Sequence, residues 1–365
     1  MAETLHAPDT LDALVAQVRA SRGFAHKQDI GAVMRRLGPT ATATPLPAGM
    51  QTLVPNGDDT AVLPAPASGG YLLFAIEGLV ADFVAAMPWF AGYSGVLVNI
   101  SDVAAMGGRP TAVVDALWCE GEAQAAEIVA GMRTAAERYG VPLVGGHTNL
   151  RHGGGGQLAV AVLGHAKKLI TSFDAKPGHT LLMAVDLRGR WHDPYPFWDA
   201  STQAPAERLR GDIALLPQIA EAGLCGAGKD ISMAGVLGTT LMLAECSGVG
   251  AFIDLDRIPR PEGAPLLRWL DAFPSFGYLL SVAPQHVRAV QERFIQRGIA
   301  CAAIGEVNAG STLTLAMRDE ATGAPQMATL WDLAEQSFIT GSVRAMPATA
   351  AAAGTAATTA EAAHA

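Results

Sequence analysis

Two adjacent carboxylates in the first part of the chain have the residue types and spacing expected of a phosphate-handling site. Asp58 and Asp59 follow an Asn-Gly turn and precede an apolar, strand-like run. Adjacent carboxylates repel each other unless a cation lies between them, and Mg²⁺ is usually held by one or two such oxygen ligands together with substrate phosphates. The pair predicts either a divalent-cation site or an Asp-rich hairpin turn.

A second polar group interrupts the apolar stretch 95–110. Asn99, Ser101 and Asp102 lie within this stretch, which is too apolar for a surface loop. Buried polar groups cost free energy unless each has a partner. The stretch is therefore either a hydrogen-bonded helix packed in a core or a segment whose Asp102 faces a metal ion or a phosphate.

Two further charged residues lie in segments that need an interpretation. Apolar spacing predicts a helix over 10–20, and the polar segment 23–30 after it is either a mobile arm that brings Lys27 to an anion or a solvated linker. The octet 223–230 fits the G-x-x-x-x-G-K pattern, but it follows a helical pattern and ends in Asp230 where Ser or Thr is required, which excludes a P-loop. A helix predicted over 230–247 makes Asp230 a candidate acidic cap.

Composition limits the function classes. The 365 residues carry 34 acidic and 25 basic side chains, a net charge of −9, and half of them are hydrophobic. This length predicts two domains with separate cores, and the acidic balance argues against a nucleic-acid partner. The four cysteines lie far apart, which argues against a zinc cluster or a disulfide framework. No signal peptide or membrane-spanning run is evident, so a soluble, cytoplasmic protein is expected.

Strands alternate with helices along both halves of the chain, which predicts an α/β protein with mixed sheets. An irregular, aromatic segment at 188–210 is expected to lie over a pocket or a partner surface. Strands are expected at 71–76, 111–118, 142–149, 158–163, 180–185, 250–255, 278–282, 300–307 and 312–316. The range 142–149 is expected to be a strand that ends in a turn. The strand at 312–316 is expected to close the second domain. Helices are expected at 120–139, 212–222, 265–273 and 285–298, in addition to 10–20 and 230–247.

Three blocks of sequence occur in a characteristic order. Residues 57–62, 99–110 and 144–148 resemble the ordered signatures of the aminoimidazole ribonucleotide (AIR) synthetase-like superfamily, which includes thiamine-monophosphate kinase and selenophosphate synthetase. In the second half, 230–259 and 304–307 are similar to the C-terminal domain of that kinase. The resemblance implies a dimerising N-terminal domain (49–168) and a C-terminal α/β domain (169–320). Apolar spacing adds an N-terminal helix and arm (1–48), and composition predicts a disordered Ala/Thr-rich tail (345–365).

The resemblance also implies ATP in a cleft between the domains, with its phosphates held through Mg²⁺ and not by a Walker loop. It assigns Asp58, Asp59, Glu77 and Asp102 as metal ligands, and Lys27 and Asp230 as catalytic residues. It assigns the following residues to the nucleotide: Asn99, Ser101, Gly145, Gly146, His147 and Thr148.

The sequence departs from the kinase pattern at three positions. Glu77 replaces an aspartate, His147 replaces the aspartate of a Gly-Gly-Asp-Thr motif, and Met233-Ala234 replaces Asp-Gly. His147 would bind metal or phosphate, or hydrogen-bond to the backbone. Thiamine-phosphate kinase activity is therefore not implied, and the sequence is typical of a divergent member of the superfamily.

Two functions from different classes follow. The first is ATP- and Mg²⁺-dependent phosphoryl transfer to, or phosphate activation of, a small-molecule substrate by a homodimeric kinase or synthetase. The second is a non-catalytic, nucleotide-binding homodimeric scaffold or accessory subunit. A dinucleotide- or flavin-dependent enzyme is disfavoured because no G-x-G-x-x-G follows a strand.

Overall fold

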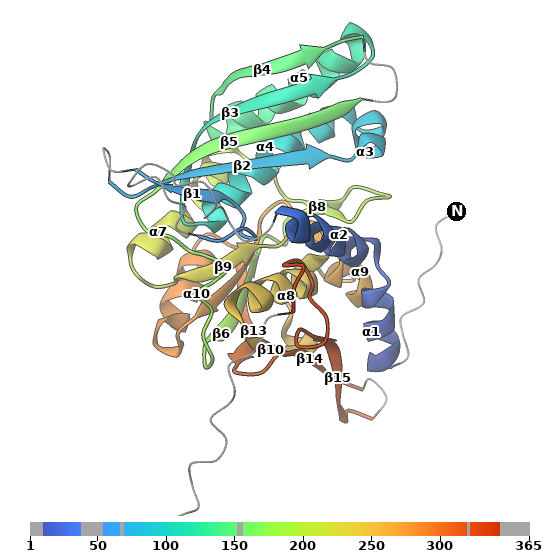
Figure 1. The fold of residues 1–365 in the computed structure, drawn as a ribbon, viewed down its shortest axis with the longest axis vertical. Helices are drawn as coiled ribbons and strands as arrows, with labels where there is room; N and C mark the ends of the chain where they lie inside the picture. Colours follow the sequence, from blue (N-terminus) through green and yellow to red (C-terminus); the bar gives the residue numbers. More distant parts are fainter. Residues whose placement is uncertain (1–9, 38–53, 66–68, 152–155, 320–321, 344–365) are drawn as a thin grey trace, which may run out of the picture.

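The protein has two lobes, each built on its own sheet (Figure 1). The computed structural model describes residues 10–37, 54–65, 69–151, 156–319 and 322–343. The Ala/Thr-rich tail expected at 345–365 lies outside these residues. One hydrophobic cluster runs from the N-terminal sheet into one face of the C-terminal sheet, and a second cluster covers the other face of the C-terminal sheet, so the prediction of two separate cores is wrong. The α/β class and the two-lobe architecture are confirmed.

The N-terminal lobe is a five-stranded sheet in the order β1-β2-β5-β3-β4. Strands β2, β5 and β3 pair antiparallel, whereas β3 and β4 are parallel and joined by helix α5. Helices α4 and α5 lie behind the sheet as it is drawn in Figure 1. The elements of this lobe are β1 (Ala61–Pro64), β2 (Tyr71–Leu79), α3 (Ala81–Ala86), α4 (Pro88–Ala105), β3 (Arg109–Trp118), α5 (Gly121–Tyr139), β4 (Leu143–Asn149) and β5 (Gln157–Ala166).

The stretch 95–110 mostly forms α4, which ends at Ala105 before β3 begins at Arg109. Its buried polar residues are therefore in a packed helix, as the first interpretation has it. Asp102 also lines the cleft described below, so that its role toward a metal ion or a phosphate stays a prediction. The turn predicted at the end of 142–149 is wrong, because β4 continues to Asn149. Residues 145–148 are thus strand residues paired with β3.

The C-terminal lobe is a seven-stranded sheet in the order β15-β14-β10-β13-β6-β12-β9. Its strands are β6 (Thr180–Val185), β9 (Ala227–Asp230), β10 (Gly250–Asp254), β12 (Gly277–Val282), β13 (Ala300–Asn308), β14 (Thr312–Arg318) and β15 (Pro325–Asp332). Its helices are α6 (Ala206–Ile213), α7 (Leu215–Glu221), α8 (Gly235–Ser247), α9 (Leu266–Leu270) and α10 (Val287–Ile295).

Two predictions about this lobe are wrong. The sheet does not close at β14, because β15 pairs with it along its length. Asp230 does not cap a helix, because it is the last residue of β9 and α8 begins only at Gly235. Ala234 precedes that helix with a left-handed backbone (φ 86°), which turns the chain sharply between strand and helix.

Two N-terminal helices, α1 (Leu11–Arg19) and α2 (Arg22–Leu37), pack on the C-terminal lobe (Figure 1). Thr10 caps α1, and the Arg19 guanidinium donates to the Leu330 carbonyl of β15 (2.6 Å). The segment around Lys27 is neither an arm nor a linker. It is helical because Phe24 anchors α2 by packing its ring against Phe338.

The segment 188–210 contributes two strands to a small three-stranded sheet in the order β11-β8-β7. The strands of this sheet are β7 (Arg190–Trp191), β8 (Phe197–Asp199) and β11 (Phe273–Pro274), and several of their aromatic side chains contact one another. Among the residues that the structure describes, no helix is long and apolar enough to cross a membrane. All four cysteines are buried free thiols.

Helices α4 and α5 approach each other at two glycines. A Cβ on Gly131 of α5 would lie 1.9 Å from the Trp89 carbonyl oxygen, and a Cβ on Gly92 of α4 would lie 2.0 Å from that of Ile128. Neither backbone can move without displacing its helix. This close crossing fixes α4, the helix that carries Asp102, against the rest of the lobe.

Substituting Gly131 by Ala tests the helix crossing. Alanine favours an isolated helix by about 1 kcal/mol over glycine, but here the added methyl group forces the helices apart. We expect Gly131→Ala to lower the free energy of unfolding by about 1–3 kcal/mol, measured by urea denaturation. Gly226→Ala is the control, because no atom lies within 4 Å of its added Cβ. A Gly131→Ala protein as stable as the wild type would contradict the crossing.

Candidate functional site

Acidic residues from both lobes converge at a cleft between them. One carboxylate oxygen from each of Asp59, Asp102 and Asp230 lies within 4.8 Å of the other two. Asp59 precedes β1, Asp102 is in the last turn of α4, and Asp230 ends β9. All three line one cleft, together with Asp58, Glu77 and Lys27. The residues that sequence analysis assigned to metal binding and catalysis are thus brought together.

Asp102 is the residue that most needs a cation. It is buried, and its Oδ2 has no hydrogen-bond partner. Burial raises the pKa of Asp102 well above its ordinary value, and the nearby carboxylates of Asp230 and Glu77 raise it further. An orphaned carboxylate oxygen in such a place costs free energy that a divalent cation would offset. The three aspartates therefore fit a hard metal ion such as Mg²⁺.

Lys229 is a site residue that sequence analysis missed. Its ammonium forms an ion pair with Asp59 across the lobes, and both side chains are almost fully buried. Burial alone would lower the pKa of Lys229, but the carboxylates of Asp59 and Asp58 more than offset this, so the pKa is raised and the ammonium stays charged. The only sequence signal was the excluded G-x-x-x-x-G-K pattern, and β9 confirms that this octet is not a phosphate loop.

Asp58 is held by the connection between the lobes. Its two oxygens accept hydrogen bonds from the Ser172 amide (2.9 Å) and hydroxyl (2.6 Å). Burial, and next the charge of Asp59, raise its pKa to about 6. Because both oxygens already have partners, this geometry favours an anchoring role for Asp58. Its predicted role as a metal ligand remains a prediction.

Lys27 and Glu77 border the same group of charges. Loss of hydration in the cleft raises the pKa of Glu77, and the positive charge of Lys27 opposes that rise. The pKa of Asp230 is raised to about 8, by burial first and then by Asp59, while Lys229 and Lys27 lower it. The raised pKa of Asp230 reflects the excess of buried negative charge at this point of the cleft, which a cation would offset.

The residues that sequence analysis assigned to the nucleotide do not all lie at the cleft. Ser101 lines the cleft, and its hydroxyl lies 2.9 Å from the Tyr278 hydroxyl of the other lobe. Asn99 is fully buried and donates to the Gly95 carbonyl (2.8 Å) within α4. Residues 145–148 are exposed on β4, at the far edge of the five-stranded sheet. Their assignment to the nucleotide remains a prediction.

Sequence signatures decide the family. Residues 57–166 match the AIR synthase related protein, N-terminal domain, and residues 187–318 match the AIR synthase related protein, C-terminal domain. The chain belongs to the AIR synthase-related family. The two matches follow the two lobes, and the first contains Asp58, Asp59, Glu77 and Asp102. The second contains Lys229 and Asp230.

Both an uncharacterised protein and named enzymes are similar to this chain. An uncharacterised protein from Synechocystis is 44% identical over 335 residues, which are 90% of this chain and 97% of that protein. The thiamine-monophosphate kinase of Synechococcus elongatus is 26% identical over 72% of this chain and 87% of its own. The fold is similar to that of Thermotoga maritima PurL complexed with ATP (TM-score 0.64, 22% identity). That match covers 87% of this chain but only 51% of PurL.

Asp102→Asn tests whether the carboxylates hold a divalent cation. Mg²⁺ at about 100 times its Kd should stabilise the wild-type protein by about 2.7 kcal/mol, seen as a rise in Tm. The amide keeps the size of the side chain but loses the charge, so we expect this Mg²⁺-dependent rise to disappear. Without metal, the variant should be at least as stable as the wild type, because a buried unpaired carboxylate is gone.

The control is Asp12→Asn, which removes an exposed charge on α1 and should leave the Mg²⁺ effect intact. The same Mg²⁺-dependent rise in Asp102→Asn as in the wild type would contradict the site.

Proposed function

We propose that this protein is a Mg²⁺-dependent, ATP-using enzyme that transfers a phosphoryl group to an oxygen of a small molecule, either as a kinase or as a synthetase that activates an amide or carbonyl oxygen. The observation that carries the proposal is the convergence of Asp59, Asp102 and Asp230 around the orphaned Asp102 oxygen. Family membership supports it, since thiamine-monophosphate kinase and PurL complexed with ATP are similar to this chain.

The roles of the chain's own residues follow from charge and position. When bound, Mg²⁺ supplies charge that offsets the triphosphate, and Asp59, Asp102 and Asp230 would hold it. The bond between the γ-phosphorus and its bridging oxygen breaks, a P–O bond forms to the acceptor, and ADP leaves. Asp230 would take the acceptor's proton on the carboxylate oxygen that does not face the metal site. Lys27, which lines the same cleft, offsets the charge of the transferring group.

Lys27→Met and Asp230→Asn test this assignment by Mg²⁺-dependent ADP formation from ATP with a panel of small-molecule acceptors. We expect Lys27→Met to lower turnover by about 10²-fold, because one stabilising charge is lost from the transition state. Asp230→Asn should lower turnover further, since it also removes a ligand. Lys168→Met, an exposed lysine outside the cleft, is the control and should be as active as the wild type.

Turnover that is unchanged in both variants would contradict these roles. Tight ATP binding without turnover on any acceptor would favour the alternative, a nucleotide-binding scaffold. The cytoplasmic location stays a prediction.

We also propose that two copies of the chain associate through the open face of the five-stranded sheet. Alternation places Leu73 and Ala75 against α4 and leaves the opposite face of β2 exposed. Its apolar side chains include Ile76, which is 63% exposed. Large apolar side chains are exposed on all five strands of this sheet, namely Leu63, Leu72, Phe74, Ile76, Val114, Val144 and Leu163. A contiguous apolar face of this kind is typical of a self-association surface.

Phe74→Glu tests the dimer. A charge in the middle of a desolvated apolar interface is costly, so we expect the wild type to sediment as a dimer and Phe74→Glu as a monomer. Met327→Glu is the control, because Met327 is also exposed but belongs to β15 of the other lobe. A monomeric wild type, or a variant that stays dimeric, would contradict the proposed interface.

A further inference from the structure

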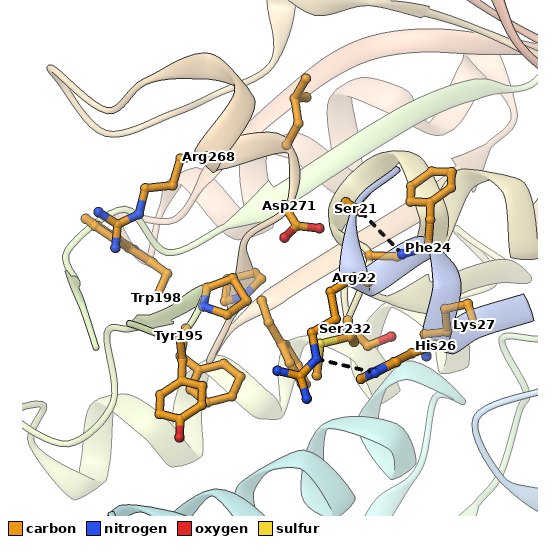
Figure 2. A pocket seen from close by; sticks show the side chains of 18 of the residues that line it. Ser21, Arg22, Phe24, His26, Lys27, Tyr195, Trp198, Ser232, Arg268 and Asp271 are labelled. Atoms are coloured by element: carbon orange, nitrogen blue, oxygen red, sulfur yellow. Dashed lines mark hydrogen bonds between the residues drawn. The ribbon is translucent and has the colours of Figure 1, made fainter. Parts of the chain in front are cut away.

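The cleft extends well beyond the carboxylates. Its volume is about 2370 Å³, larger than the roughly 300–1,000 Å³ of an ordinary small-molecule pocket. One end contains the aspartates and Lys229. The other end is bordered by α2, by the aromatic segment around β8 and by the turn before β11 (Figure 2). The cleft therefore has room for a second molecule beside a nucleotide.

One wall of this second region is cationic through Arg22 and Lys27. Arg22 and His26 are four residues apart on α2 and share one face of the helix, and Lys27 of the same helix also lines the cleft. Figure 2 shows Arg22 and His26 extending into the space that Tyr195 borders, and the Arg22 Nε lies 3.4 Å from His26 Nε2. Within the described part of the chain, neither Arg22 nor Lys27 has a carboxylate within ion-pair distance. These cations are available to a ligand.

Another wall of the region is aromatic. The rings of Tyr195 and Phe197 stack with their centroids 5.2 Å apart and their planes at 10°. Both contact the edge of Phe83, and the Tyr195 hydroxyl donates to the Asp82 carbonyl (3.4 Å). Both are only half-buried, so ring surface is exposed to the cleft. Because β8 pairs with both β7 and β11, this wall is held in place by backbone hydrogen bonds.

Two other charged residues that line the cleft, Arg268 and Asp271, already have partners. Arg268 forms an ion pair with Asp193 and lies over the Trp191 ring, 4.0 Å from its centroid. Asp271 interacts with the Ser21 hydroxyl at the start of α2. Lys27 is shared between the two regions: it belongs to the cationic wall and interacts electrostatically with Glu77 and Asp230. A ligand anion bound by the cationic wall therefore lies next to the transfer site.

We propose that this region is the acceptor pocket, and that the acceptor is a small molecule with a planar aromatic ring and an anionic group such as a phosphate or carboxylate. The ring lies against Tyr195 and Phe197, and the anion is bound by Arg22 and His26. This inference rests on the proposed function for the direction of phosphoryl transfer. The aromatic-anion site itself is independent of it.

The experiment uses the full chain saturated with AMPPCP and Mg²⁺ and titrates it, by calorimetry, with matched probes. Thiamine monophosphate, flavin mononucleotide and pyridoxal phosphate carry both a ring and an anion. Thiamine and riboflavin carry the ring alone, and ribose 5-phosphate carries the anion alone. We expect at least one aromatic phosphate to bind at least tenfold more tightly than its matched partial probes.

Variants then test how much each of the two walls contributes to binding of the probe. Arg22→Ala and Tyr195→Leu should each weaken the best probe by about tenfold or more, because one loses the charged partner and the other the ring surface. Two matched controls should bind like the wild type: Arg36→Ala, which removes an exposed arginine of α2 outside the cleft, and Tyr195→Phe, which keeps the ring.

Three outcomes would overturn the pocket: binding of no aromatic anion, equal binding of ribose 5-phosphate, or equal affinities in all variants. Loss of Mg²⁺-dependent AMPPCP binding by the wild-type chain would instead count against the proposed function. The probes can then be titrated without nucleotide, so the two failures are distinguishable.

Discussion

Compensation of buried negative charge is the constraint on which this structure depends. Asp59, Asp102 and Asp230 are drawn together from three distant segments, and Asp58 and Glu77 lie nearby. Lys229 offsets part of this charge through its ion pair with Asp59, while the Asp102 Oδ2 remains without a partner. Like charges so close are unfavourable in a low dielectric. The protein's own cations therefore leave part of the negative charge at this site uncompensated, and a divalent cation with phosphate ligands would compensate it.

The same contacts join the two lobes. The Asp59–Lys229 ion pair, the Asp58 hydrogen bonds to Ser172 and the Ser101–Tyr278 hydroxyl contact each link the N-terminal lobe to residues beyond it. One hydrophobic cluster also runs from the N-terminal lobe into one face of the seven-stranded sheet, so apolar packing joins the lobes as well, and the polar contacts lie where the lobes face each other at the cleft. A change in charge at the site, such as the binding of a metal ion, therefore acts on the lobe interface as well.

Helix α2 gives the cleft its second region. It begins directly after α1, which is held on β15, and its Phe24 packs in the aromatic cluster with Trp331 and Phe338. This anchoring places Lys27 beside the carboxylates and Arg22 towards the aromatic wall. One helix thus supplies charge both to the transfer site and to the proposed acceptor pocket. Because α2 precedes the residues that match the family, this wall belongs to a part of the chain outside the shared domains.

The sequence by itself determined the elements whose signals are local. The 3.6-residue spacing in α1 and α5, the left-handed Gly140 after α5 and the apolar runs of β3, β5, β6 and β12 are properties of neighbouring residues, and these elements were predicted well. The ordered motifs around Asp58, Asp59 and Asp102 were likewise sufficient to predict the family and a metal site. Sequence alone did not settle whether stretch 95–110 was core or site, because a helix can serve as both.

Only the tertiary structure decided what depends on partners far away in the chain. Lys229 could not be recognised as a site residue, because its role comes from Asp59 on the other lobe. Asp230 looked like a helix cap until β9 placed it at a sheet edge, and segment 23–30 looked like a linker until Phe24 was found packed against residues more than 300 positions later. Local propensity does not predict such contacts, because the partners of buried charges and aromatic rings come from segments that lie far apart in the sequence and meet only in the folded protein.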